Sequence, residues 1–139
     1  MMVLRQETRA RARALQLLYA WETDGQPSAD QVLTSLDNIL GEDREVRGLA
    51  ADLFRGVVRE SNSLDARIQP AAEHWRLERF ALVDRNILRL AIYELVHQRV
   101  PPRVAIDEAL WLAHRFGGTQ TPSFVNGVLD PIARSLGQL

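Results

Sequence analysis

The residues with the clearest capacity for binding chemistry are arginines near the N-terminus. The stretch RQETRARARALQLLYAWE, residues 5–22, contains four arginines and then becomes apolar. Wound as an α-helix, it places Arg5, Arg9 and Arg13 within about 80° of one another. Gln16 falls in the same sector. Because a guanidinium can donate two parallel hydrogen bonds to one phosphate, this spacing predicts a row that binds a polyanion.

The opposite side of the same helix is apolar, so the helix can dock by one face and present its arginines on the other. Its apolar residues are Ala10, Ala14, Leu17, Leu18 and Trp21. Arg11 lies at the boundary between the two faces, with Tyr19 nearby. Like charges four residues apart destabilise a helix by a few tenths of a kcal/mol, and cations are also unfavourable at its N-terminal end. A bound anion would relieve both effects, and an ordinary solvated face is the alternative.

An aromatic side chain opens the last amphipathic segment, TPSFVNGVLD, residues 121–130. Phe124 lies about 100° from the centre of that segment's apolar stripe. It can therefore stack on an unpaired base, and the alternative is that it packs against another helix. We expect Asn126 and Gly127 to be structural, through a side-chain hydrogen bond and a close helix approach.

Asp84 falls on the apolar side of its predicted helix but within the first turn. A carboxylate there complements the helix dipole, which is the simplest explanation for it. The alternative is a surface contact with a basic protein partner.

Signs of catalysis are weak. His74, His97 and His114 never recur at the three- or four-residue steps that put two metal ligands on one helical turn, and there is no cysteine. Asp107 and Glu108 point about 100° apart on a helix, so they do not form a carboxylate pair. We expect no enzyme, no cofactor and no metal.

The elements that must position these residues are all helical. Hydrophobic periodicity predicts a single all-α domain of about seven helices within the 139 residues. Ser28 is a plausible N-cap of the second helix, Ser61 or Ser63 of the fourth, and Thr121–Pro122 opens the last. The expected helices cover residues 6–22, 28–40, 42–60, a short segment ending near residue 70, 82–97, 103–116 and 121 onward.

The charge is unevenly distributed. The net charge is −1 overall, whereas residues 1–21 carry four arginines against one glutamate and the remainder is acidic. A basic end on an acidic body favours local attraction of an anion. The apolar run ALQLLYAW is interrupted by Gln16 and leads into Glu22, so we expect neither an export signal nor a membrane span, and a cytoplasmic location.

Several ordered segments resemble the NusB family of bacterial transcription antitermination factors. They are RARALQLLYAWE, VDRNILRLAIYEL followed by VAIDEALWLAHRFG, and FVNGVLD at 124–130. The resemblance covers nearly the whole chain. It implies a fold of two small helical bundles packed together, and a non-enzymatic role. It also implies binding to single-stranded boxA RNA of nascent ribosomal RNA transcripts, together with a small-subunit ribosomal protein (NusE), within the RNA polymerase antitermination complex.

The resemblance also implies roles for particular residues. The RNA surface would comprise Arg5, Arg9, Arg11 and Arg13, with Gln16, Tyr19 and Phe124 beside them. Asp84 would face the ribosomal protein. The chain departs from the family pattern where Glu7 and Thr8 precede Arg9, and where Ala12–Arg13 replaces the usual glutamate.

Two alternatives to an antitermination factor belong to other classes of protein. The same helical fold occurs as the RNA-binding domain of certain ribosomal RNA methyltransferases, for whose catalytic domain 139 residues leave no room. The other alternative is a protein-binding helical adaptor, or a homodimer that buries its arginines.

Overall fold

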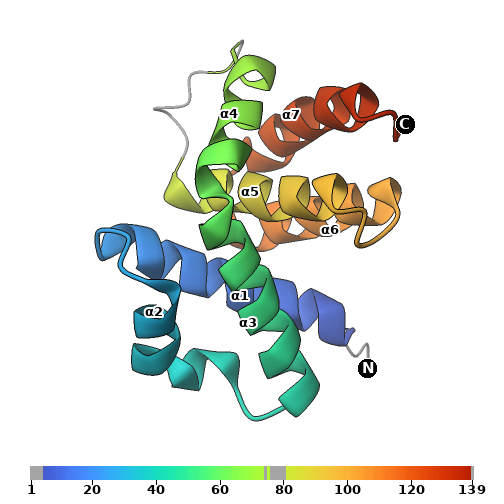
Figure 1. Cartoon of the computed structure of the whole chain (residues 1–139). Helices are drawn as coiled ribbons and strands as arrows, with labels where there is room; N and C mark the ends of the chain where they lie inside the picture. The colour runs from blue at the N-terminus through green and yellow to red at the C-terminus, as the bar shows by residue number, and fades with distance from the viewer. Residues whose placement is uncertain (1–4, 74, 76–80, 139) are drawn as a thin grey trace. The chain divides into compact units, whose positions relative to one another are not determined.

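A computed structural model describes residues 5–73, 75 and 81–138, and within these ranges every regular element is a helix (Figure 1). The all-α prediction is confirmed. The chain divides into two compact units, residues 1–59 and 60–139. The elements are α1 (Gln6–Thr23), α2 (Ala29–Ser35), the 3-10 helix η1 (Asp37–Leu40), α3 (Arg44–Arg59), α4 (Ser61–Ala71), α5 (Leu82–Val96), α6 (Pro102–Phe116) and α7 (Thr121–Ser135).

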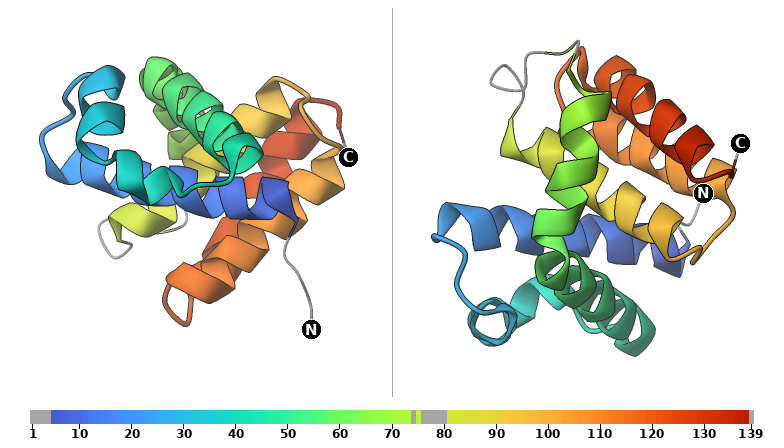
Figure 2. Two further views of the ribbon diagram at one scale, coloured as in Figure 1. Left: turned by 90° about the horizontal axis from the view of Figure 1, so that it is seen from below. Right: turned by 45° about the horizontal axis from the view of Figure 1, so that its top comes forward.

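The first unit is built on the contact between α1 and α3, which cross one another in both views of Figure 2. Helix α2 and η1 also contact α1. The Ser28 cap is confirmed, because its Oγ accepts a hydrogen bond from the Gln31 N–H at 3.2 Å and Gln31 Oε1 accepts one from the Ser28 N–H at 3.1 Å. The single helix predicted over 28–40 is wrong, since α2 ends at Ser35 and η1 follows.

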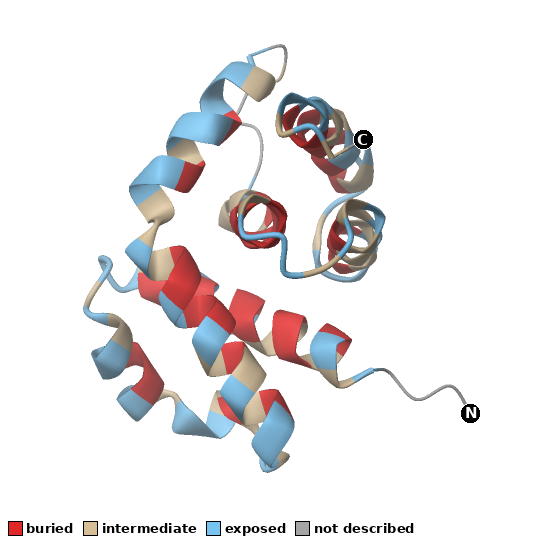
Figure 3. Cartoon of the chain, turned by 45° about the vertical axis from the view of Figure 1, so that its right-hand side comes forward, coloured by how far each residue is buried: buried red, intermediate tan, exposed pale blue. Residues whose placement is uncertain are grey.

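The second unit is built around α5, which contacts α4, α6 and α7. Every residue of α5 from Asn86 to Leu95 is buried, as the red ribbon in Figure 3 shows. Pro102 begins α6 at a position where its missing N–H costs nothing. The predicted serine cap of α4 is not formed, because Glu60 occupies the N-cap position and makes no side-chain capping bond.

Candidate nucleic-acid interface

Helix α1 has the two faces that its sequence predicted. Ala10, Ala14, Leu17 and Leu18 are completely buried and Trp21 nearly so, and the Trp21 Nε1–H donates to the Pro27 carbonyl at 3.0 Å. Arg5 and Gln16 are exposed, and Arg9 and Arg13 are partly exposed. We call these last four residues the arginine row.

The arginine row lies beside the loop that precedes α3. A Cβ built on Gly41 would lie 3.6 Å from Arg13 Nη2, so this guanidinium rests against the loop backbone. Gly41 has φ of 75°, a conformation that glycine adopts without strain. Arg9 Nη1 lies 3.6 Å from Asp43 Oδ2, an ion pair in which both side chains are about one-third exposed.

Asp43 also caps α3. Its Oδ1 accepts hydrogen bonds from the N–H groups of Glu45 at 3.0 Å and Val46 at 3.2 Å. The hydrogen bond from Val46, followed by those from Gln6 and Glu45 and the charge of Arg9, lowers the pKa of Asp43 below its ordinary 3.8. Because the pKa is lower in the folded protein, the ionised carboxylate stabilises the fold above pH 3.8 and this contribution is lost as the pH falls further. The sequence reasoning missed Asp43, although an aspartate just before an amphipathic helix is an N-cap signal.

The structure gives no support to the RNA-facing role that the family resemblance implied for Arg11. The residue is only 4% exposed, and it interacts within the protein. Its position at the boundary of the apolar face placed it among packed side chains. Tyr19, in contrast, is 47% exposed and is one of two large hydrophobic side chains that stand out on the described surface.

Of the two roles left open for Phe124, the structure confirms packing within the protein and gives no support to stacking on a base. The side chain is 0% exposed, and its ring meets the Trp75 indole edge-on with centroids 5.4 Å apart. A Cβ on Gly127 would lie 2.9 Å from Trp75 Cζ2, so the absence of a side chain there admits the indole. The close approach expected at Gly127 is thus made by Trp75, while Asn126 is exposed. Phe124 has no open face for a base and is a core residue.

The structure confirms the simplest explanation of Asp84, a carboxylate in the first turn of its helix, and the partner-facing role stays a prediction. Asp84 is 4% exposed, and both of its carboxylate oxygens accept hydrogen bonds. Oδ2 accepts from the Ala81 N–H at 3.0 Å, and Oδ1 accepts from Thr121 Oγ1 at 3.0 Å. Thr121 Oγ1 in turn accepts from the Gly118 N–H at 2.9 Å. The carboxylate therefore ties the start of α5 to the start of α7, and it is a structural group.

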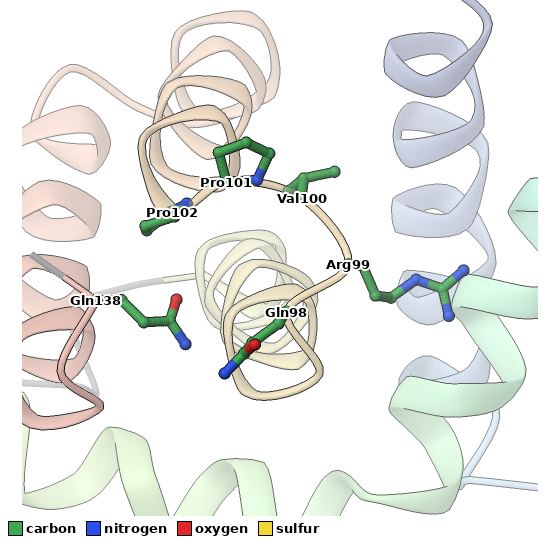
Figure 4. A pocket seen from close by; sticks show the side chains of 6 residues that line it. All are labelled: Gln98, Arg99, Val100, Pro101, Pro102 and Gln138. Carbon is green, nitrogen blue, oxygen red and sulfur yellow. The ribbon is translucent and has the colours of Figure 1, made fainter.

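A hollow in the second unit lacks the side chains that acid–base or nucleophilic catalysis would use. It has a volume of about 420 Å³ and is lined by Gln98, Arg99, Val100, Pro101, Pro102 and Gln138 (Figure 4). The Arg99 side chain points away from the hollow, and its guanidinium lies 5.7 Å from the centre of the Tyr93 ring. Gln138 is held by a 2.7 Å hydrogen bond to the Leu95 carbonyl. No carboxylate or hydroxyl side chain lines it.

Metal-binding and membrane-spanning features were sought over the described ranges. No group of three potential metal-binding side chains occurs there, and His74 lies outside those ranges. None of the helices in these ranges has the length and apolar character needed to cross a membrane.

Comparisons with known proteins agree on one family. The NusB family model matches residues 8–134. A protein of Solibacter usitatus (strain Ellin6076) named transcription antitermination protein NusB is 45% identical over 129 residues, covering 92% of this chain and 88% of its own. The solved NusB of T. maritima is 34% identical, with a TM-score of 0.81 over 96% of this chain and 93% of that one. A chain in a complex of antitermination factors NusB and NusE with dsRNA is 25% identical, with a TM-score of 0.80 over 96% of this chain and 99% of its own.

Proposed function

The chain belongs to the NusB family, and from this premise we propose that it is a transcription antitermination factor. It binds single-stranded boxA-type RNA of nascent ribosomal RNA transcripts together with the small-subunit ribosomal protein NusE. Residues 1–139 act as one RNA-binding domain in the cytoplasm, within the RNA polymerase antitermination complex, and they act by binding and not by catalysis. The observation that carries the proposal is the arginine row on the exposed face of α1.

The arginine row supplies the contacts to phosphate. Arg5 is exposed at the N-cap of α1, and Arg9 and Arg13 follow one turn apart on the same face. Three guanidiniums at this spacing can follow a sugar–phosphate chain, while Gln16 offers an amide for hydrogen bonding.

Tyr19 supplies the aromatic surface that Phe124 does not. Its ring is 47% exposed, and it lies one turn beyond Gln16 on α1. A base that stacks on an exposed ring contributes about 1–3 kcal/mol to binding a single strand. The phosphate contacts and the stacked base therefore come from one helix.

RNA binding by the isolated protein is expected to be weak and sensitive to salt. Three arginine–phosphate contacts with a single strand predict a log–log salt slope of about −2. Replacing both Arg9 and Arg13 with alanine should flatten the slope by about one to two units, because two of the contacts are lost. Fluorescence anisotropy with a labelled boxA-type oligonucleotide at several salt concentrations measures the slope.

A matched control removes two arginines elsewhere. Arg67 on α4 and Arg134 on α7 are exposed, and replacing both with alanine lowers the net charge by the same amount. This control should leave the slope nearly unchanged. An unchanged slope in the Arg9/Arg13 variant would place the RNA site away from α1.

The partner and the form of the RNA are tested together. The chain, NusE and their mixture are titrated with a boxA-type single strand, a scrambled single strand and a duplex of the same sequence. We expect the mixture to bind the boxA strand more tightly than either protein does alone, and more tightly than the scrambled strand. Equal binding of both strands would favour a non-specific adaptor, and sedimentation of the chain alone tests the homodimer alternative.

A further inference from the structure

One acidic residue stands directly against the arginine row. In the free protein Asp43 Oδ2 lies 3.6 Å from Arg9 Nη1, and Arg13 rests beside Gly41 two residues earlier in the same loop. The two arginines that the proposed function assigns to RNA phosphates therefore already face a segment that carries a negative charge.

We propose that Asp43 is a built-in counter-anion of the arginine row, and that its carboxylate limits the affinity of this protein for RNA phosphate. This inference rests on the proposed RNA surface and deepens it. Asp43 neutralises Arg9 in the free protein, and it repels a phosphate that approaches the same guanidinium. The residue thus determines affinity without belonging to the RNA-contacting set.

The geometry favours exchange of Arg9 between Asp43 and a phosphate. At 3.6 Å the pair is longer than a charged N–H···O hydrogen bond, so Arg9 is held by attraction between charges and loses no direct bond when it leaves. The side chains of Arg9 and Asp43 are 38% and 32% exposed, so a phosphate can reach them. The pair Arg47–Asp37 differs, because it is hydrogen-bonded and Arg47 also donates to the Gly41 carbonyl at 2.6 Å.

Asp43 cannot move away when the phosphate arrives. Its other oxygen, Oδ1, is held by the N–H groups of Glu45 and Val46 at the start of α3. These bonds also keep the carboxylate ionised, since they lower the pKa of Asp43. A fixed negative charge therefore remains next to the row in the RNA-bound protein.

The decisive variant is Asp43→Asn, because asparagine removes the charge and is an equally good N-cap. We expect it to bind a single-stranded RNA about threefold more tightly than the natural protein at about 50 mM salt, the size of effect typical of one exposed ion pair. The gain should become smaller at about 500 mM salt, where charges are screened over a few ångströms. Asp37→Asn, which makes the same change in net charge within the same unit, should leave affinity nearly unchanged.

A double-mutant cycle assigns the effect to Arg9. In an Arg9→Gln background, Asp43→Asn should give a clearly smaller gain, because the guanidinium whose charge Asp43 neutralises is gone and only the repulsion between Asp43 and phosphate remains. An equal gain from Asp37→Asn, or a gain of undiminished size without Arg9, would overturn the inference in favour of a general effect of net charge. Unchanged or weaker binding by Asp43→Asn would overturn it directly.

A further titration keeps the inference distinct from the proposed function. Titration with inorganic polyphosphate reports the anion affinity of the row even if RNA does not bind. Absence of RNA binding by the natural protein would therefore count against the proposed function, whereas absence of a gain with polyphosphate would count against the role of Asp43. Asp43→Ser, which also caps a helix, replaces Asp43→Asn if thermal melting shows that the asparagine variant is unfolded.

Discussion

Replacing Phe124 with alanine is expected to lower the free energy of unfolding by about 3–5 kcal/mol. The ring is completely buried, and it meets Trp75 edge-on at a centroid distance of 5.4 Å. Alanine would leave a cavity in the second unit that Trp75 could fill only partly, and it would also remove a favourable aromatic pair. Because Gly127 already lets the indole pack closely, there is little room for further collapse.

Denaturant unfolding measures this loss. Phe116→Ala is the matched control, since Phe116 is 39% exposed and its truncation should cost far less. RNA binding by the Phe124 variant, measured where the protein is still folded, should stay within about twofold of the natural value, because no stacked base is lost. A variant with full stability and weakened RNA binding would restore the stacking role and refute the core assignment.

The contrast between Phe124 and the apolar face of α1 shows what helical periodicity can predict. On α1, Ala14, Leu17 and Leu18 are buried by the face that their spacing marks. Periodicity describes the main stripe of one helix, so it could not show that Trp75, from outside α7, covers a second side of that helix. Phe124 lies on that second side, which is why the sequence reasoning left its role open.

Only part of the candidate interface could be predicted, because periodicity describes one helix and not the segments that pack against it. The faces of α1 follow from local spacing, and the exposure of Arg5 and Gln16 agrees with them. The ion pair between Arg9 and Asp43 joins residues distant in the sequence, and it depends on how α3 begins beside α1. No period within either segment encodes that pair. The break between α2 and η1 was missed because the apolar spacing continues through it.

The second large loss of stability is expected when Asp84 is replaced. Its carboxylate accepts hydrogen bonds from the Ala81 N–H and from the Thr121 hydroxyl, and it is 4% exposed. Hydrogen bonds to a charged group each contribute about 1.5–3 kcal/mol. Asp84→Ala removes both acceptors and should therefore lower the free energy of unfolding by about 2–4 kcal/mol, allowing for partial access of water to the Ala81 N–H.

Asp84→Asn should cost about half as much as Asp84→Ala. Asparagine keeps one acceptor oxygen, but its amide N–H₂ must then face either the Ala81 N–H or the Thr121 hydroxyl. The hydroxyl can rotate, but it already accepts from the Gly118 N–H and would have to find a new acceptor for its proton. Asp107→Asn on α6 is the control, since Asp107 is exposed and the change should stay within about 0.5 kcal/mol.

The graded order of these variants separates a structural carboxylate from a partner contact. A carboxylate that only ties α5 to α7 predicts that stability falls from the natural protein to Asn and then to Ala. Any protein partner should bind all folded variants equally well at a temperature well below melting. If Asp84→Asn instead melts like the natural protein while partner affinity falls tenfold, which is about 1.4 kcal/mol, Asp84 would be a contact residue for the partner and not a structural carboxylate.

The Thr121→Val variant sharpens this test, because it removes the hydrogen bond between Thr121 and Asp84 from the other side. The double variant should lose less stability than the sum of the two single losses, since both single variants break the one bond that joins Thr121 to Asp84.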